Sequence, residues 1–182
     1  LSTVTLCFLF VFSVAGEDNW VENTYKLHKE LMSNRGYTYK ANPQPEQNHT
    51  THVMLDLLVR SISIDDKTQI LTLNAWVLQY WKDHRLKWDP KDFGNLHETW
   101  LPFYYFWNPK LMVYNSAFPT QTFHYGYTPA VVYHTGMVQW VTPMTTKTEC
   151  AMDLTYWPYD TQDCYIVMGS WTDHGFQVDF HP

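Results

Sequence analysis

Short apolar runs of strand length recur along this 182-residue sequence, and turn-forming residues separate them. Six runs have this character: His52–Ile64, Gln69–Trp81, Tyr127–Tyr133, Met137–Val141, Cys164–Gly169 and Phe176–Phe180. Several short strands without a convincing helix between them favour an all-β domain, either an antiparallel sandwich or a barrel. Because the sequence stops just after the last run, we expect the final strands of the sheet to be missing.

A single helix is predicted before the first strand. Apolar and aromatic side chains recur there at helical spacing, and the residues concerned are Val21, Tyr25, His28 and Met32. The turn-forming stretch Asn34–Gly36 then ends the helix. Residues 42–51 are polar and contain two prolines, which is typical of a connector.

Strand periodicity predicts which side chains share a face of the sheet. In the run Ile70–Leu78, Trp76 alternates in phase with the polar Thr72 and Asn74 and out of phase with the apolar positions, namely Leu71, Leu73, Ala75 and Val77. A large aromatic side chain on the polar face of a strand suggests a partner or a ligand. The same alternation places Gln139 and Val141 on one face and turns Val138 and Trp140 to the other.

The beginning of the sequence resembles a secretion signal. An apolar run, Leu6–Val14, is followed by small residues, and polar sequence begins at Glu17. The run is too short to cross a bilayer. We therefore expect residues 1–16 to be a signal peptide and residues 17–182 to form one domain. A glycosylation sequon at Asn48 agrees with an extracellular location.

Charge and motif content argue against several functions. The net charge of -6 makes nucleic acid an improbable partner. An arrangement of nucleophile and base is not readable, and the histidines of His49–His52 fall in the polar connector, so we expect neither an enzyme nor a cofactor. A secreted sandwich whose exposed aromatic side chains stack on sugars remains an alternative.

The two cysteines that remain after signal removal, Cys150 and Cys164, enclose thirteen residues with Trp157-Pro158-Tyr159-Asp160 near the centre. In an oxidising compartment we expect them to form a disulfide, which would stabilise the fold by roughly 3 kcal/mol in the chain-entropy model. A zinc site needs more ligands than this stretch offers, because it contains no histidine. We expect no metal.

This thirteen-residue loop resembles the signature of the Cys-loop pentameric ligand-gated ion channels. Other motifs agree with the extracellular domain of nicotinic acetylcholine receptor subunits in order and spacing from about Trp20 onward. These are the tryptophan-rich stretch Trp76–Gly94, the Trp107-x-Pro109 motif that leads to Tyr114-Asn115, and Gly169–Thr172.

The resemblance implies an immunoglobulin-like β-sandwich with an N-terminal helix, assembled as a ring of five homologous subunits. Acetylcholine or a similar cationic agonist would bind between neighbours. Tyr114 and Trp171 would belong to the principal face of the site. The complementary face would carry Trp76 with Val131, Gln139 and Val141. We assign Trp81, Trp88 and Trp140 to packing.

The resemblance also implies a mechanical role for the cysteine loop, in which Trp157, Pro158 and Asp160 relay agonist binding to a pore. The stretch Ser63–Gln69, which contains Asp66, resembles the loop that shares this task. Acetylcholine-binding proteins, the soluble pore-free alternative, carry a polar cysteine loop, whereas the loop here is apolar. We therefore expect a channel subunit on the extracellular side of the plasma membrane, held there by a transmembrane domain absent from this sequence.

One residue departs from the family pattern. Lys110 stands where the family usually has an aspartate that helps to fix the second binding loop near Ser170 and Trp171. The substitution reverses a charge and puts the geometry of Trp171 in question. The third binding loop of the family would lie beyond Pro182.

Overall fold

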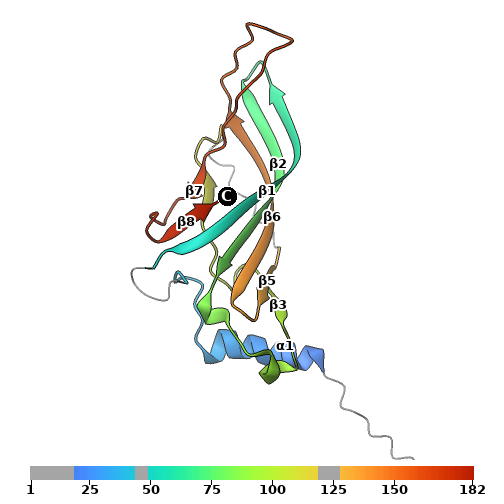
Figure 1. The fold of residues 1–182 in the computed structure, drawn as a ribbon, viewed down its shortest axis with the longest axis vertical. Coiled ribbons are helices and arrows are strands. Elements are labelled where there is room, and N and C mark those ends of the chain that lie inside the picture. The colour runs from blue at the N-terminus through green and yellow to red at the C-terminus, as the bar shows by residue number, and fades with distance from the viewer. Residues whose placement is uncertain (1–18, 44–48, 119–127) are drawn as a thin grey trace, which may run out of the picture.

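The computed structural model describes residues 19–43, 49–118 and 128–182, and these residues form an elongated molecule with one helix at its end (Figure 1). The predicted signal peptide and Asn48 lie outside the described residues. Helix α1 spans Trp20–Lys29 and continues into a π-helical segment, Glu30–Asn34. The side chain of Asn19 caps α1 by accepting a hydrogen bond of 3.3 Å from the backbone N–H of Glu22.

The predicted helix is confirmed, but its buried face differs from the one that the sequence spacing indicates. Leu27 and Leu31 are completely buried, whereas Val21 and Tyr25 are exposed. Because two overlapping apolar stripes run along this helix, periodicity alone does not determine which one packs on the sheet. None of the described helices is long and apolar enough to span a membrane.

The strands form a large sheet and a small one. The six-stranded sheet has the order β3-β5-β6-β2-β1-β8 and contains β1 (Thr51–Asp65), β2 (Ile70–Lys82), β3 (Glu98–Leu101), β5 (Ala130–Tyr133), β6 (Met137–Glu149) and β8 (Val178–His181). The second sheet pairs β4 (Leu111–Val113) with β7 (Met168–Ser170). All these strand pairs are antiparallel except β1 with β8, which are parallel. The architecture is that of the expected β-sandwich with one short N-terminal helix.

The long strands match their sequence predictions better than the short ones do. Strands β1 and β2 begin and end within one residue of the predicted bounds, whereas β6 continues to Glu149, well beyond Val141. Of the predicted strand 164–169, only the last two residues are in β7. Strands β3 and β4 and two 3-10 helices, His84–Leu86 and Pro90–Phe93, were not predicted, because three or four residues are too few to show a period.

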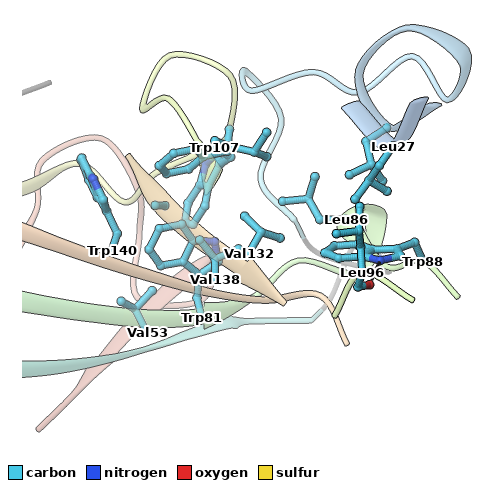
Figure 2. Close-up of a cluster of buried hydrophobic side chains, with 14 of the residues drawn as sticks. Leu27, Val53, Trp81, Leu86, Trp88, Leu96, Trp107, Val132, Val138 and Trp140 are labelled. Carbon is cyan, nitrogen blue, oxygen red and sulfur yellow. Dashed lines mark hydrogen bonds between the residues drawn. The ribbon is translucent and has the colours of Figure 1, made fainter. Parts of the chain in front are cut away.

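A tryptophan-rich core lies between the sheet and α1 (Figure 2). Trp81 and Trp140 are almost completely buried, and Trp88 nearly so, which confirms their assignment to packing. The ring of Trp81 lies 5.9 Å from those of Phe106 and Trp107, in the range of favourable aromatic pairs. The indole N–H of Trp88 donates to the Leu96 carbonyl at 2.7 Å, so its one polar atom is satisfied inside the core.

An ion pair between Asp83 and Arg85 accounts for two of the charged residues of the tryptophan-rich motif. The completely buried Asp83 carboxylate accepts two hydrogen bonds from the Arg85 guanidinium, at 2.8 and 2.9 Å, and one from the Tyr37 hydroxyl at 2.8 Å. Burial, together with the charge of Asp83, raises the pKa of Tyr37. Gly136 closes the cluster: a Cβ atom there would lie 2.5 Å from the Asp83 carbonyl oxygen. These residues hold the loop after β2 in place.

Candidate functional site

Tyr114 and Trp171 come together at the small sheet, although 57 residues separate them in the sequence. Pairing of β4 with β7 sets Leu111 opposite Ser170 and Val113 opposite Met168, so Tyr114 and Trp171 follow opposite ends of this short antiparallel pair. The Tyr114 side chain spans the distance, because its hydroxyl reaches the Ser170 carbonyl. Their ring centroids are 6.2 Å apart, with planes inclined at 47°. Both side chains are largely exposed, so their faces are accessible to a ligand.

The backbone holds this aromatic pair at both ends. The Tyr114 N–H donates to the Val167 carbonyl at 2.8 Å, and the Trp171 N–H donates to the Lys110 carbonyl at 3.2 Å. The Tyr114 hydroxyl donates to the Ser170 carbonyl, which draws the ring across Gly169. A Cβ atom at Gly169 would lie 2.8 Å from that ring, so glycine leaves the space that Tyr114 occupies. The sequence motif Gly169–Thr172 contained this residue, but its role was not predicted.

Lys110 contacts the loop that carries Trp171 through its backbone. Its ammonium group donates to the Asn108 side chain at 3.0 Å, while its backbone carbonyl still holds Trp171. Ser170 instead contacts the carboxylate of Asp173. Its hydroxyl donates to Asp173 at 2.8 Å and accepts from the Asp173 N–H at 3.1 Å. An aspartate three residues along the chain thus supplies a carboxylate to Ser170, although position 110 carries a lysine. Asp173 was not predicted, although Ser-x-x-Asp is a spacing at which these two residues commonly exchange hydrogen bonds.

The residues assigned to the complementary face share one face of the six-stranded sheet. Residues directly opposite each other in antiparallel strands point to the same side. Register pairs Val131 with Gln139 and Leu78 with Val141, and it sets Trp76 opposite Pro143 on the same strand. Trp76 therefore lies four residues, or about 13 Å, along the sheet from the row of Gln139.

The alternation predicted for β2 and β6 is confirmed. Leu71, Leu73, Ala75 and Val77 are buried, and Trp76 lies on the opposite, partly exposed face. Likewise Val138 and Trp140 point into the core, and Gln139 and Val141 do not. The Tyr133 hydroxyl donates to the Gln139 side-chain oxygen at 3.1 Å, which positions that amide.

Trp76 borders an open groove of about 360 Å³. Arg60 on β1 also lines it, with the guanidinium carbon 5.9 Å from the Trp76 ring centroid. This is within the range of a cation–π contact. The tryptophan already attracts a cation in its own chain, and the sequence analysis had not identified Arg60.

The cysteine loop lies at the end of the molecule farthest from α1 (Figure 1). Cys150 and Cys164 are joined by the expected disulfide. Within the loop, Gln162 bonds both the backbone N–H and the carbonyl of Asp153, at 3.1 and 2.9 Å, and also donates to the Asp160 carboxylate. Trp157 and Pro158 remain exposed at its tip.

The turn between β1 and β2 lies beside the cysteine loop. The Cys150 N–H donates to the carbonyl of Gln69 at 2.9 Å, which joins the two segments. Asp66 is exposed in this turn. Its neighbour Asp65 is bonded by the Thr68 hydroxyl and by the Lys67 N–H, and these bonds lower the Asp65 pKa. The turn is ordered by its own side chains, and its exposed surface is free for contacts outside the chain.

Comparison with known proteins gives a consistent result over nearly the whole domain. A family profile described as the neurotransmitter-gated ion-channel ligand binding domain matches residues 24–182. The acetylcholine receptor subunit alpha-L1 of Schistocerca gregaria is 36% identical over 160 residues, which are 85% of this chain and 27% of that protein. The neuronal acetylcholine receptor subunit alpha-10 of Rattus norvegicus is 37% identical over 159 residues, 87% of this chain and 35% of that protein.

A third relative extends the match toward the beginning of the sequence. The acetylcholine receptor subunit alpha-like 2 of Drosophila melanogaster is 34% identical over 181 residues, which are 96% of this chain and 30% of that protein. The chain thus spans about a third or less of the length of these relatives.

Proposed function

Because the chain belongs to the family of neurotransmitter-gated ion-channel ligand-binding domains, we propose that it binds a cationic agonist at the boundary between subunits of a nicotinic-type receptor. The observation that carries this proposal is the exposed Tyr114–Trp171 pair, whose rings are 6.2 Å apart. Acetylcholine or a similar cation is the expected agonist, since the relatives are named as acetylcholine receptor subunits.

The chemistry of a quaternary ammonium fits this pair. Such a cation cannot lose its charge by deprotonation, and it donates no conventional hydrogen bond. A cage of electron-rich rings is therefore an effective receptor for it. The negative faces of electron-rich rings attract it, with about 0.5–2 kcal/mol for each good contact and more where water is excluded. Two rings inclined at 47° form two walls of a cage that remains open on its other sides.

A neighbouring subunit would close the cage. Trp76, Val131, Gln139 and Val141 lie on a different sheet from Tyr114 and Trp171, so each subunit would present one set to the neighbour on either side. A ring of homologous subunits, five in this family's architecture, satisfies both faces at once. Arg60 would then compete with the agonist for the Trp76 ring, because both are cations.

Agonist binding would reach a pore through the cysteine loop. Its exposed apolar tip, with Trp157 and Pro158, would dock on a membrane domain, and Asp160 and Asp66 would complete the contact. The hydrogen bond between Cys150 and Gln69 supports joint movement of the loop and the β1–β2 turn. In this proposal the subunit reaches the cell surface, including postsynaptic membranes, and gates a cation current.

The test compares two exposed tryptophans in the full-length receptor subunit. Trp171 and Trp20 have exposed fractions of 69% and 54%, so neither is needed for the core. Trp171→Ala should weaken acetylcholine binding by roughly 1–3 kcal/mol, or about 5- to 150-fold, through loss of a cation–π anchor. Trp20→Ala should leave binding unchanged.

Equal agonist affinities in the wild type and Trp171→Ala would refute the proposed principal face. Agonist binding by a secreted pentamer, without current in any subunit combination, would favour the soluble acetylcholine-binding type instead.

A further inference from the structure

Two histidines and an aspartate converge where β8 pairs with β1. In the parallel register His52 faces Asp179, and His181 follows Asp179 by two residues on the same strand. Because side chains alternate along a strand, the three project from one face of the sheet. One ligand atom from each lies within 4.8 Å of the other two.

The distances within this cluster suit a metal ion. The His52 Nδ1 atom is 3.0 Å from the His181 Nε2 atom, which is 3.2 Å from Asp179 Oδ2. Bonds of about 2.0–2.1 Å from zinc to its ligands give tetrahedral edges of about 3.3–3.4 Å. Both printed separations are a few tenths of an ångström shorter than such an edge, so a small movement of the side chains apart would place these ligands at corners of a tetrahedron.

The chemistry of the three donors selects the type of metal. Two imidazoles with one carboxylate suit zinc and related transition-metal ions, whereas calcium and magnesium prefer oxygen ligands. The carboxylate also offsets part of the charge of the ion. The fourth position remains for water, because the cluster is at least partly exposed on the edge strand β8.

We propose that His52, Asp179 and His181 form a binding site for Zn²⁺ that joins β8 to β1. This goes beyond the proposed function and does not depend on it. It also replaces the sequence-based interpretation of His52 as a solvated connector residue, since His52 is in β1. The sequence gives little sign of such a site, because 127 and 129 residues separate His52 from its two partners.

The site lies on the same face of the sheet as the residues assigned to the complementary face, which include Trp76 and Gln139. His181 pairs with Met54, Met54 with Tyr80, and Tyr80 with Gln139, so one continuous row crosses the sheet. Three strand intervals separate His181 from Gln139, which is about 14 Å. Zinc would therefore bind at the edge of the proposed complementary face.

The test is a titration of the full chain, purified with its disulfide intact, with Zn²⁺ in one series and Ca²⁺ in another. We expect one Zn²⁺ per chain by calorimetry and no Ca²⁺ binding. His52→Ala, Asp179→Asn and His181→Ala should each weaken Zn²⁺ binding by at least about tenfold. His174→Ala removes an exposed histidine outside the cluster and should bind Zn²⁺ like the wild type.

Two further measurements distinguish Zn²⁺ binding at the three-residue site from weak Zn²⁺ binding at single surface histidines. Zn²⁺ should raise the Tm of the wild type and of His174→Ala but not that of His181→Ala. A ligand that binds only the folded protein stabilises it, and His181→Ala lacks the intact site. Co²⁺ should give the visible absorption of a tetrahedral complex. The proposal is overturned if 1 mM Zn²⁺ does not bind, or if His174→Ala loses as much affinity as the cluster variants. Circular dichroism without metal checks that each variant is folded.

Discussion

Near α1, Trp81 and Trp140 are almost completely buried, whereas Tyr156, Trp157 and Tyr159 at the opposite end have exposed fractions of 76, 69 and 92%. The same types of side chain thus have opposite surroundings in one domain. At the first end, aromatic rings fill a core that also contains Leu27 and Leu31 of the helical segment. At the second, they lie in a disulfide-closed loop whose apolar tip projects into solvent.

The contrast separates a part that is stable by its own contacts from one that presents surface. Aromatic side chains that bury their area contribute to stability. A cluster of exposed aromatic side chains contributes little within the chain and marks a place where another surface docks. Mutations at the first end should therefore change stability, and mutations at the second end should change function.

The largest expected effect is on the packed end. Trp81→Ala removes a buried ring between Phe106 and Trp107 and should lower the free energy of unfolding by about 3–5 kcal/mol. Chemical denaturation measures this change. Trp100→Ala, an exposed tryptophan on β3, is the matched control and should cost under about 1 kcal/mol. Similar losses in the two variants would contradict the assignment of Trp81 to the core.

The second-largest loss of stability is expected on removal of the disulfide. The double variant Cys150→Ser, Cys164→Ser opens a loop with a sequence separation of 14 and should lower stability by roughly 3 kcal/mol through the entropy of the unfolded chain. The yield of secreted protein and its urea midpoint report this loss. Unchanged secretion and an unchanged midpoint would show that the local hydrogen bonds of Gln162 suffice to hold the loop.

Trp157→Ala should separate function from stability. Because this ring is exposed, its loss should change the free energy of unfolding by less than about 0.5 kcal/mol. In the full-length receptor, the same variant should reduce the agonist-evoked current while equilibrium agonist binding stays close to the wild type. A loss of binding equal to that of Trp171→Ala would contradict a role in coupling alone.

A smaller effect is expected at the groove of Trp76. Arg60→Gln removes the cation that contacts this ring and should strengthen agonist binding by about 0.5–1 kcal/mol, or two- to fivefold, at sites where this subunit is complementary. Concatenated pentamers restrict the variant to one interface. Arg35→Gln, far in sequence from the groove, serves as the charge-matched control, and improved binding in both variants would indicate a general effect of net charge.

The smallest effect concerns pH. Burial lowers the pKa of His28 below the ordinary value for histidine, and its ring bonds the Thr99 hydroxyl at 2.8 Å. The unfolded chain therefore binds this proton more readily, and the stability contributed by neutral His28 should decline as pH falls below about 6.5. His28→Gln should reduce the slope of unfolding free energy against pH in this range. An identical slope in both proteins would exclude His28 as its source.

The residues of the site differ in how far the sequence predicts them. Alternation along a single strand placed Trp76, Gln139 and Val141 on the partly exposed face, since a period of two holds wherever a strand is long enough. The family resemblance singled out Tyr114 and Trp171. Arg60 was missed, because its contact with Trp76 depends on the pairing of two strands. Asp173 was missed although it follows Ser170 at a local Ser-x-x-Asp spacing.

Local patterns were sufficient for the all-β class, the N-terminal helix, the long strands and the disulfide pairing, since each depends on residues close together in the chain. Tertiary packing chose between the two stripes of α1, paired β8 with β1 in parallel, and brought Tyr114 beside Trp171 and His52 beside His181. These juxtapositions depend on the register of strands that are distant in sequence. Register depends on which apolar side chains the whole sheet buries, and a short stretch of sequence does not determine this.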